Sequence, residues 1–208
     1  AYSRLMADDE KATIAALDRA RAVFAKHIEA NQGRVVDTAG DSVLAVFDTT
    51  NGAVRASVAI QDELSALNEG VPEPRQMQFR IGIHLGDIHE KADGTVYGDG
   101  VNVAARLEGI ADPAGIIVSD MVHGAVAGRV NAAFADIGEH EVKNIAKPVQ
   151  AYRVMAEGAV VPEPSRPRPR FRHLAIVVVI LLLGLPAMLW QWWQNPVIEP
   201  APGGPILA

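Results

Sequence analysis

The 208-residue sequence contains no cysteine. This absence excludes disulfides, thiolate nucleophiles and cysteine-ligated zinc or iron–sulfur centres, so any bound metal has to use oxygen or imidazole ligands. An excess of positive charge is also absent, because the formal net charge is −6. An acidic chain is a poor candidate for non-specific nucleic-acid binding. We therefore expect no nucleic-acid partner and no sulfur-bound metal.

One long apolar run is present near the end of the sequence. Leu174 to Leu189 carries no charge, and residues 173–193 are long enough to cross roughly 30 Å of hydrocarbon at about 1.5 Å per residue. Four arginines immediately precede the run and no basic residue follows it; they are Arg166, Arg168, Arg170 and Arg172. The positive-inside rule then places the preceding domain in the cytoplasm. We predict a single transmembrane helix over 173–193, with a buried core helix as the alternative.

Composition divides the rest of the chain. Residues 1–156 have the mixed pattern of a folded domain, whereas 157–172 are rich in proline and arginine and predict an extended spacer. Residues 194–208, rich in proline and glycine, follow the predicted span on its outer side. The sequence begins with alanine and ends without a folding signal, so we expect a piece of a longer protein.

Periodicity predicts two amphipathic helices with a hairpin between them. Apolar residues recur at helical spacing from Ile14 to Ile28, behind a cap at Asp8 or Asp9, and again from Val54 to Leu67. Between them, two apolar runs in residues 35–47 flank Thr38-Ala39-Gly40-Asp41-Ser42. This pattern is typical of a hairpin whose tip presents a carboxylate.

The remaining segments complete an α+β pattern. We expect strands at 79–85, 116–119, 134–138 and 149–154, a turn at Asp93-Gly94 and a short helix at 101–110. This order predicts a sandwich with helices on one face of a mixed sheet.

Four blocks then resemble a known family in their order and spacing. They are residues 37–47 (DTAGDSVLAVF), 79–86 (FRIGIHLG), 96–107 (VYGDGVNVAARL) and 141–145 (EVKNI). Together they resemble the class III adenylate and guanylate cyclase catalytic domain, over roughly residues 1–155. The resemblance implies a ferredoxin-like mixed-sheet sandwich and the conversion of a nucleoside triphosphate to its 3′,5′-cyclic nucleotide and pyrophosphate.

The resemblance assigns roles to particular residues. It implies that Asp41 is one of two carboxylates that hold two Mg²⁺ or Mn²⁺ ions. It implies that Asn102 orients the ribose and that Arg106 stabilises the phosphate in the transition state. The last two lie at i and i+4 and therefore share one helix face. The alternatives are a Gly-Asp turn at residue 41 and an exposed polar pair on the helix.

Further binding residues follow from the same resemblance. Lys147, or alternatively Lys143, matches the family's triphosphate-binding lysine. The opening residues, including Tyr2 and Ser3, resemble the nucleotide-binding turn that follows the family's first strand. The family's first metal aspartate would lie about three residues upstream of Ala1. We therefore predict that the isolated 208-residue chain lacks metal-dependent turnover.

Base selection is left open by two positions. Asp37 falls where adenylate cyclases have a lysine, and Thr95 falls where they have an aspartate. A carboxylate at 37 accepts hydrogen bonds from guanine N1–H or from the adenine 6-amino group, and the bacterial character of the sequence favours ATP over GTP. The resemblance also implies a homodimer, with the metal carboxylates and the Asn–Arg pair of each site on different subunits.

Two rival functions remain. The first is a catalytically inactive cyclase-like module that binds nucleotide or dimerises and regulates a membrane protein. The second, a polymerase palm or diguanylate cyclase, would need a Gly-Gly-Asp/Glu-Glu-Phe hairpin that Gly40-Asp41-Ser42 does not provide. His84 and His89 have no third ligand at recognisable spacing, so we expect surface or turn histidines rather than a metal site.

Overall fold

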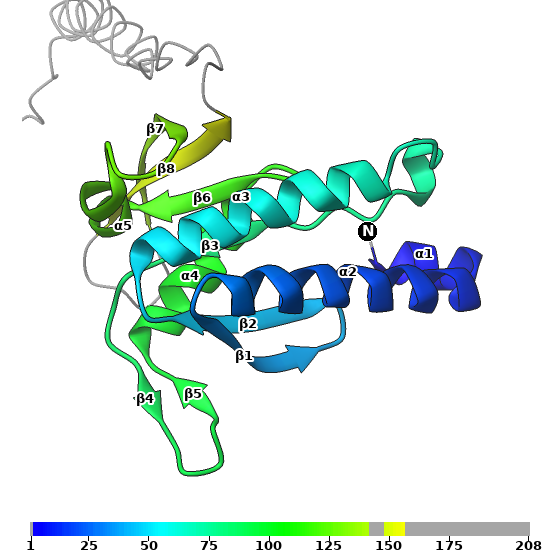
Figure 1. Ribbon diagram of the computed structural model, residues 1–208, viewed down its shortest axis with the longest axis horizontal. Coiled ribbons are helices and arrows are strands. Elements are labelled where there is room, and N and C mark those ends of the chain that lie inside the picture. Colours follow the sequence, from blue (N-terminus) through cyan, green and yellow to red (C-terminus); the bar gives the residue numbers. More distant parts are fainter. Residues whose placement is uncertain (1, 142–147, 157–208) are drawn as a thin grey trace, which may run out of the picture. The chain divides into compact units, whose positions relative to one another are not determined.

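The structure is a computed structural model that describes residues 2–141 and 148–156. Figure 1 shows these residues as a sheet with helices packed against it, a separate hairpin and a projecting two-stranded arm. In chain order the elements are α1 (Tyr2–Asp8), α2 (Glu10–Ala30), β1 (Gly33–Ala39), β2 (Ser42–Phe47), α3 (Thr50–Leu67), the 3₁₀ turn η1 (Glu73–Arg75), β3 (Ile81–Ile83), β4 (His89–Glu90), β5 (Val96–Tyr97), α4 (Asp99–Ile110), β6 (Ile116–Ser119), α5 (Asp120–Val126), β7 (Ala132–His140) and β8 (Val149–Ala156).

Helix α2 begins at the cap that the sequence predicts. The Asp9 side chain accepts a hydrogen bond from the backbone N–H of Ala12 at 3.0 Å, which satisfies one of the N–H groups that a helix start leaves free. Leu17, Phe24 and Ile28, spaced for one helix face, are buried. With Ile60 and Leu64 of α3 and the inner side of the hairpin, this face forms the first part of the core.

The predicted hairpin is confirmed. Strands β1 and β2 pair antiparallel from Gly33–Phe47 to Ala39–Ser42. Gly40 at the tip has a φ of +60°, a left-handed conformation that glycine adopts without steric cost. Val43, Ala45 and Phe47 pack against α2 and α3. The tip, residues 39–42, is exposed.

The main sheet is mixed, as predicted, with the strand order β3-β6-β8-β7. Strand β3 runs parallel to β6, and β8 pairs antiparallel with both β6 and β7. Strand β3 is shorter than the predicted 79–85 segment, because only Ile81–Ile83 pairs with β6.

The prediction that helices cover one face of the sheet is wrong. Ile116 and Val118 of β6 pack with α3 and α5, whereas Ile117 between them packs with Val103 and Leu107 of α4. Alternate residues of a strand point to opposite faces, so α4 covers the second face. The unbroken apolar run of β6 fits a strand buried on both sides.

Three further features differ from the prediction. Tyr2 and Ser3 open helix α1 instead of forming a turn; Leu5 is buried, and the Thr13 hydroxyl donates to its carbonyl at 2.9 Å. Helix α5 and the β4–β5 arm were not predicted. Each is too short to show periodicity, since α5 has seven residues and each arm strand has two.

Several predictions fall outside the described residues. Lys143, Lys147, the 157–172 linker, the 173–193 span and the 194–208 segment are among them. Within the part of the chain that the structure describes, no helix combines the length and apolar character needed to cross a membrane.

Candidate active site

Asp41 lies at the tip of the β1–β2 hairpin, with its side chain exposed. The preceding residue is held from α2, where Arg21 Nη2 donates to the carbonyl oxygen of Gly40 at 2.5 Å. Within the described residues, this is the one side-chain hydrogen bond made to the tip. The tip therefore presents a free carboxylate on a backbone that is anchored at one point.

Asn102 and Arg106 share the outer face of α4, as their spacing predicts. Both are exposed, whereas Val103 and Leu107 on the other side of the helix are buried against the sheet. Among the described residues, neither polar side chain has a hydrogen bond or an ion pair. The pair is therefore free to contact a ligand.

Helix α4 is seated closely on β3. A Cβ added at Gly82 would overlap the carbonyl oxygen of Ala104 and the backbone nitrogen of Glu108. Beside this contact, Arg80 Nε lies 2.9 Å from Glu108 Oε1. The missing side chain at residue 82 lets the helix approach, and the ion pair holds it alongside the strand.

His84 directly follows β3, on the strand face that Gly82 shares and that α4 covers. Its Nδ1 lies 2.9 Å from the hydroxyl oxygen of Ser119, which is fully buried at the end of β6. Burial lowers the pKa of His84 below its ordinary value of 6.5, and the carboxylate of Asp120 acts in the opposite direction. The expected surface histidine is therefore half-buried and bonded inside the domain. His89 is exposed on the arm, as expected.

The two predicted base-selecting residues lie on different elements. Asp37 is exposed on β1, opposite Leu44 and just after an irregularity in the strand register. Thr95 is exposed in the arm, where its N–H donates to Asp93 Oδ1 at 2.9 Å and lowers the pKa of that carboxyl. Within the described residues, no hydrogen bond joins Asp37 to Thr95, although Arg34 of β1 and Glu90 of the arm form an ion pair.

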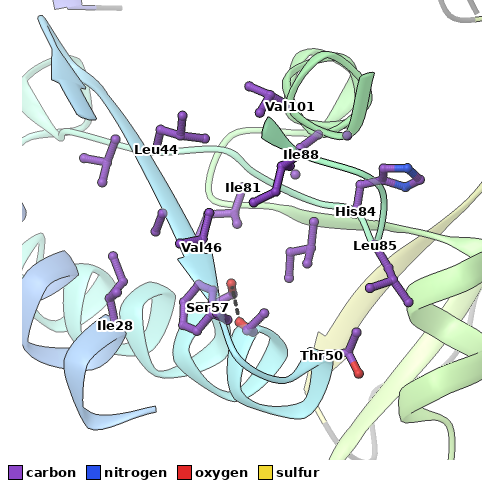
Figure 2. A pocket seen from close by; sticks show the side chains of 18 of the residues that line it. Ile28, Leu44, Val46, Thr50, Ser57, Ile81, His84, Leu85, Ile88 and Val101 are labelled. Atoms are coloured by element: carbon purple, nitrogen blue, oxygen red, sulfur yellow. Dashed lines mark hydrogen bonds between the residues drawn. The ribbon is translucent and has the colours of Figure 1, made fainter. Parts of the chain in front are cut away.

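An apolar cavity of about 280 Å³ separates the hairpin from the main sheet. Figure 2 shows Leu44 and Val46 of β2 on one side and Ile81 on the other, with Val101 of α4 and Ile28 of α2 also lining it. Among the described strands, β2 pairs only with β1, and β3 pairs only with β6. The cavity therefore lies between two free strand edges.

A family model for the "Adenylate and Guanylate cyclase catalytic domain" matches residues 2–156. This chain belongs to that family.

Individual relatives of the cyclase domain agree with this assignment. "Putative adenylate cyclase 3" of Rhizobium meliloti (strain 1021) is 45% identical over 152 residues, which make up 73% of this chain and 26% of that protein. "Adenylate cyclase 1" of the same strain is 30% identical over 154 residues, 64% of this chain and 22% of that protein. The chain thus spans about a quarter of the length of these curated relatives.

A solved structure supports the fold of the cyclase domain. The adenylate/guanylate cyclase/hydrolase from Silicibacter pomeroyi is 38% identical and superposes with a TM-score of 0.66, covering 74% of this chain and 90% of that one. The mixed α+β architecture is therefore that of a cyclase catalytic domain.

The residues that support the site of this cyclase domain were not predicted from the sequence. Arg21 lies within the predicted helical segment 14–28, and Arg80 and Gly82 lie within the predicted strand at 79–85 and the family block 79–86, but no role was predicted for any of them. The alternation of residues 80–84 showed that Arg80, Gly82 and His84 share one face. It did not show that helix α4 covers that face. The pattern alone therefore fits equally well a face that packs against a helix and a face that is exposed to solvent.

Proposed function

We propose that this domain is a nucleotide cyclase that converts ATP, or less readily GTP, to the 3′,5′-cyclic nucleotide and pyrophosphate. In this reaction the ribose 3′-oxygen bonds to the α-phosphorus, the bond from that phosphorus to the β-phosphate bridging oxygen breaks, and pyrophosphate leaves. The 3′-hydroxyl proton is released. A protein accelerates such a step mainly by positioning and by stabilising charge.

The observation that carries the proposal is the freedom of three polar side chains. Asp41, Asn102 and Arg106 are all exposed and have no side-chain partner among the described residues. Two exposed arginines near these elements are instead paired with carboxylates, Arg80 with Glu108 and Arg34 with Glu90. A carboxylate, an amide and a guanidinium left unpaired are the groups that a metal-bound triphosphate requires.

The chemistry of Asp41 fits Mg²⁺ or Mn²⁺, which prefer oxygen ligands. When bound, two such ions would polarise the α-phosphate and neutralise the leaving pyrophosphate. Within the described residues, no three potential ligands cluster. In this proposal Asp41 is one carboxylate of the pair, and the second lies outside the described residues. Asn102 would orient the ribose, and Arg106 would bind the phosphate oxygens as charge develops on them.

The cavity between β2 and β3 supports a place for the second carboxylate. A strand in this gap would pair with both free edges, and it would cover the apolar side chains around Ile81 and Val46. Arg4 Nη2 donates to the carbonyl of Pro74 at 3.0 Å, so α1 lies beside the segment that leads into β3. A strand that precedes α1 could therefore run through the gap and carry the second aspartate.

Sharing of the site between two copies completes the proposal. Asp41 lies on the hairpin tip, whereas Asn102 and Arg106 lie on the outer face of α4, and no hydrogen bond or ion pair joins them in the described part of one chain. A two-fold dimer would bring the tip of one subunit to α4 of the other. The predicted span over 173–193 would raise the effective concentration of two tethered copies.

ATP is the favoured substrate because both curated relatives described above carry adenylate cyclase names. The test is cyclic-nucleotide production from ATP and from GTP, with Mg²⁺ and Mn²⁺, by the protein that contains this domain and the segment preceding it. Asp41→Ala and Asn102→Ala should each be inactive. Their mixture should recover about a quarter of the wild-type activity, because half of the dimers then hold one intact site.

The alternative is tested by measuring dimerisation and nucleotide binding of the same protein beside its turnover. A domain that dimerises and binds nucleotide but cyclises neither triphosphate would be a regulatory module instead. Membrane attachment through 173–193 and a cytoplasmic catalytic domain belong to the proposal as well, and fractionation of the full-length protein with and without that segment tests them.

A further inference from the structure

His84 and Ser119 join the ends of two parallel strands, β3 and β6, through a 2.9 Å hydrogen bond. Ser119 directly precedes α5, the N-cap position, where a serine hydroxyl usually accepts a hydrogen bond from the helix backbone. Here the side chain makes no capping bond. The buried hydroxyl forms a hydrogen bond with His84 instead, and helix α5 begins without a side-chain cap.

The imidazole of His84 in turn supports a stack of backbone segments. A Cβ added at Gly86 would lie 2.8 Å from Nε2 of His84 and 3.1 Å from the Cα of Gly100. The N–H of Gly100 donates to the carbonyl of Asp87 at 3.2 Å. The ring, the 86–87 backbone and the first turn of α4 are therefore in contact with no side chain between them, and Asn102 follows two residues later.

We propose that His84 is a positioning residue for the cyclase site. Its bond to Ser119 fixes the ring, the ring supports the Gly86–Asp87 backbone, and that backbone sets the start of α4 and with it Asn102 and Arg106. The inference rests on the proposed function, since it concerns the same site. Figure 2 shows His84 at the edge of the cavity, on the loop that follows β3.

The contacts of the ring make its charge state matter. Its burial favours the neutral form. Three carboxylates belong to the segments around it: Asp120 at the start of α5 opposes the shift, Asp87 lies in the supported loop, and Asp99 is the first residue of α4. Protonation would place a positive charge against the backbone stack and draw these carboxylates toward it, which would displace the start of α4.

Kinetics of the full-length protein test the inference with three variants. His84→Asn keeps an uncharged polar group near the position of Nδ1 but lacks the outer part of the ring, so it should lower kcat less than His84→Ala does. His84→Ala and Ser119→Ala should lower kcat by about tenfold or more, as expected when catalytic groups move. KM for the triphosphate should change less than kcat. The acid limb of the wild-type pH profile should be missing in His84→Asn. His89→Asn, on the exposed arm, is the control and should keep the limb.

The inference fails if His84→Ala retains the wild-type kcat, or if every variant loses activity only in proportion to its unfolded fraction. A second readout does not depend on turnover. In NMR titrations, the amide signals of Gly100 and Asn102 should follow the ionisation of His84 in the wild type and stay fixed in His84→Asn. Stationary signals in the wild type would overturn the inference. An inactive wild type with coupled signals would overturn only the proposed function.

Discussion

The guanidinium of Arg21 donates a hydrogen bond to the carbonyl oxygen of Gly40 at 2.5 Å, across 19 residues of sequence. Arg21 lies on the core side of α2, between buried Leu17 and Phe24, and Gly40 directly precedes the proposed metal ligand Asp41. The peptide unit between Gly40 and Asp41 is thus held by a residue of another element. Its orientation determines where the carboxylate points.

Arg21→Met should therefore weaken metal binding without unfolding the domain, because methionine keeps much of the apolar stem of arginine. Loss of a hydrogen bond from a charged group is worth about 1.5–3 kcal/mol, so the apparent Mn²⁺ affinity of the full-length protein should fall by about tenfold or more. Amide exchange at Asp41 should become faster. Arg19→Met, an exposed position on the same helix, is the control. An unchanged Mn²⁺ affinity in Arg21→Met would contradict this role.

The close packing of α4 against β3 can be tested with two matched glycine substitutions. Gly82→Ala would drive a methyl group into the backbone of α4 at Ala104 and Glu108, and it should destabilise the domain by about 1–3 kcal/mol. Gly109→Ala, near the end of the same helix, meets nothing within 4 Å and should stabilise the domain by about 0.5–1 kcal/mol. Urea unfolding measures both. Equal effects would show that the close approach at Gly82 does not constrain the helix.

The pH dependence of stability should reflect His84. Its pKa is lowered in the fold, so the unfolded chain binds a proton first as the pH falls. The stability that His84 contributes should be complete above about pH 6.5 and should decline below that value until the lower folded pKa is reached. His84→Asn should remove this part of the decline. Thermal unfolding between pH 7 and 5 would reveal it, and parallel curves for the two proteins would refute it.

Local signals in the sequence predicted much of the fold. The Asp9 cap, the apolar spacing of α2 and the glycine at the hairpin tip act over a few residues, and each produced the expected element. What covers the second face of the sheet depends on a long-range contact. In the sequence, Gly82 is only the residue without a side chain on the strand face that also carries Arg80 and His84. Its role depends on close packing against α4, which lies some twenty residues further along the chain.

The site shows the same division between local and long-range information. The exposure of Asp41 and the shared face of Asn102 and Arg106 follow from a hairpin and a helix, so spacing predicted both. The support from Arg21 and Ser119 depends on which elements meet in three dimensions. Tyr2 shows the limit of a family pattern, because packing of Leu5 and Thr13 makes its segment helical where the pattern indicated a turn.

Base selection provides the last prediction. Asp37 lies on β1 opposite Leu44, and its side chain is exposed. Its carboxylate is therefore available to the base of a nucleotide bound beside β1. A carboxylate accepts from guanine N1–H, whereas a lysine donates to adenine N1. Asp37→Lys should therefore raise the ratio of kcat/KM for ATP to that for GTP by about tenfold, since a lost or mismatched hydrogen bond discriminates strongly.

The control for this prediction is Asp62→Lys, which makes the same charge change at an exposed position on α3. A general effect of added positive charge on triphosphate binding would raise kcat/KM for both nucleotides in both variants. A specific contact would change the ratio in Asp37→Lys alone. If the ratio stays the same in Asp37→Lys while turnover persists, residue 37 does not touch the base, and selection must come from elsewhere, with Thr95 as the next position to vary.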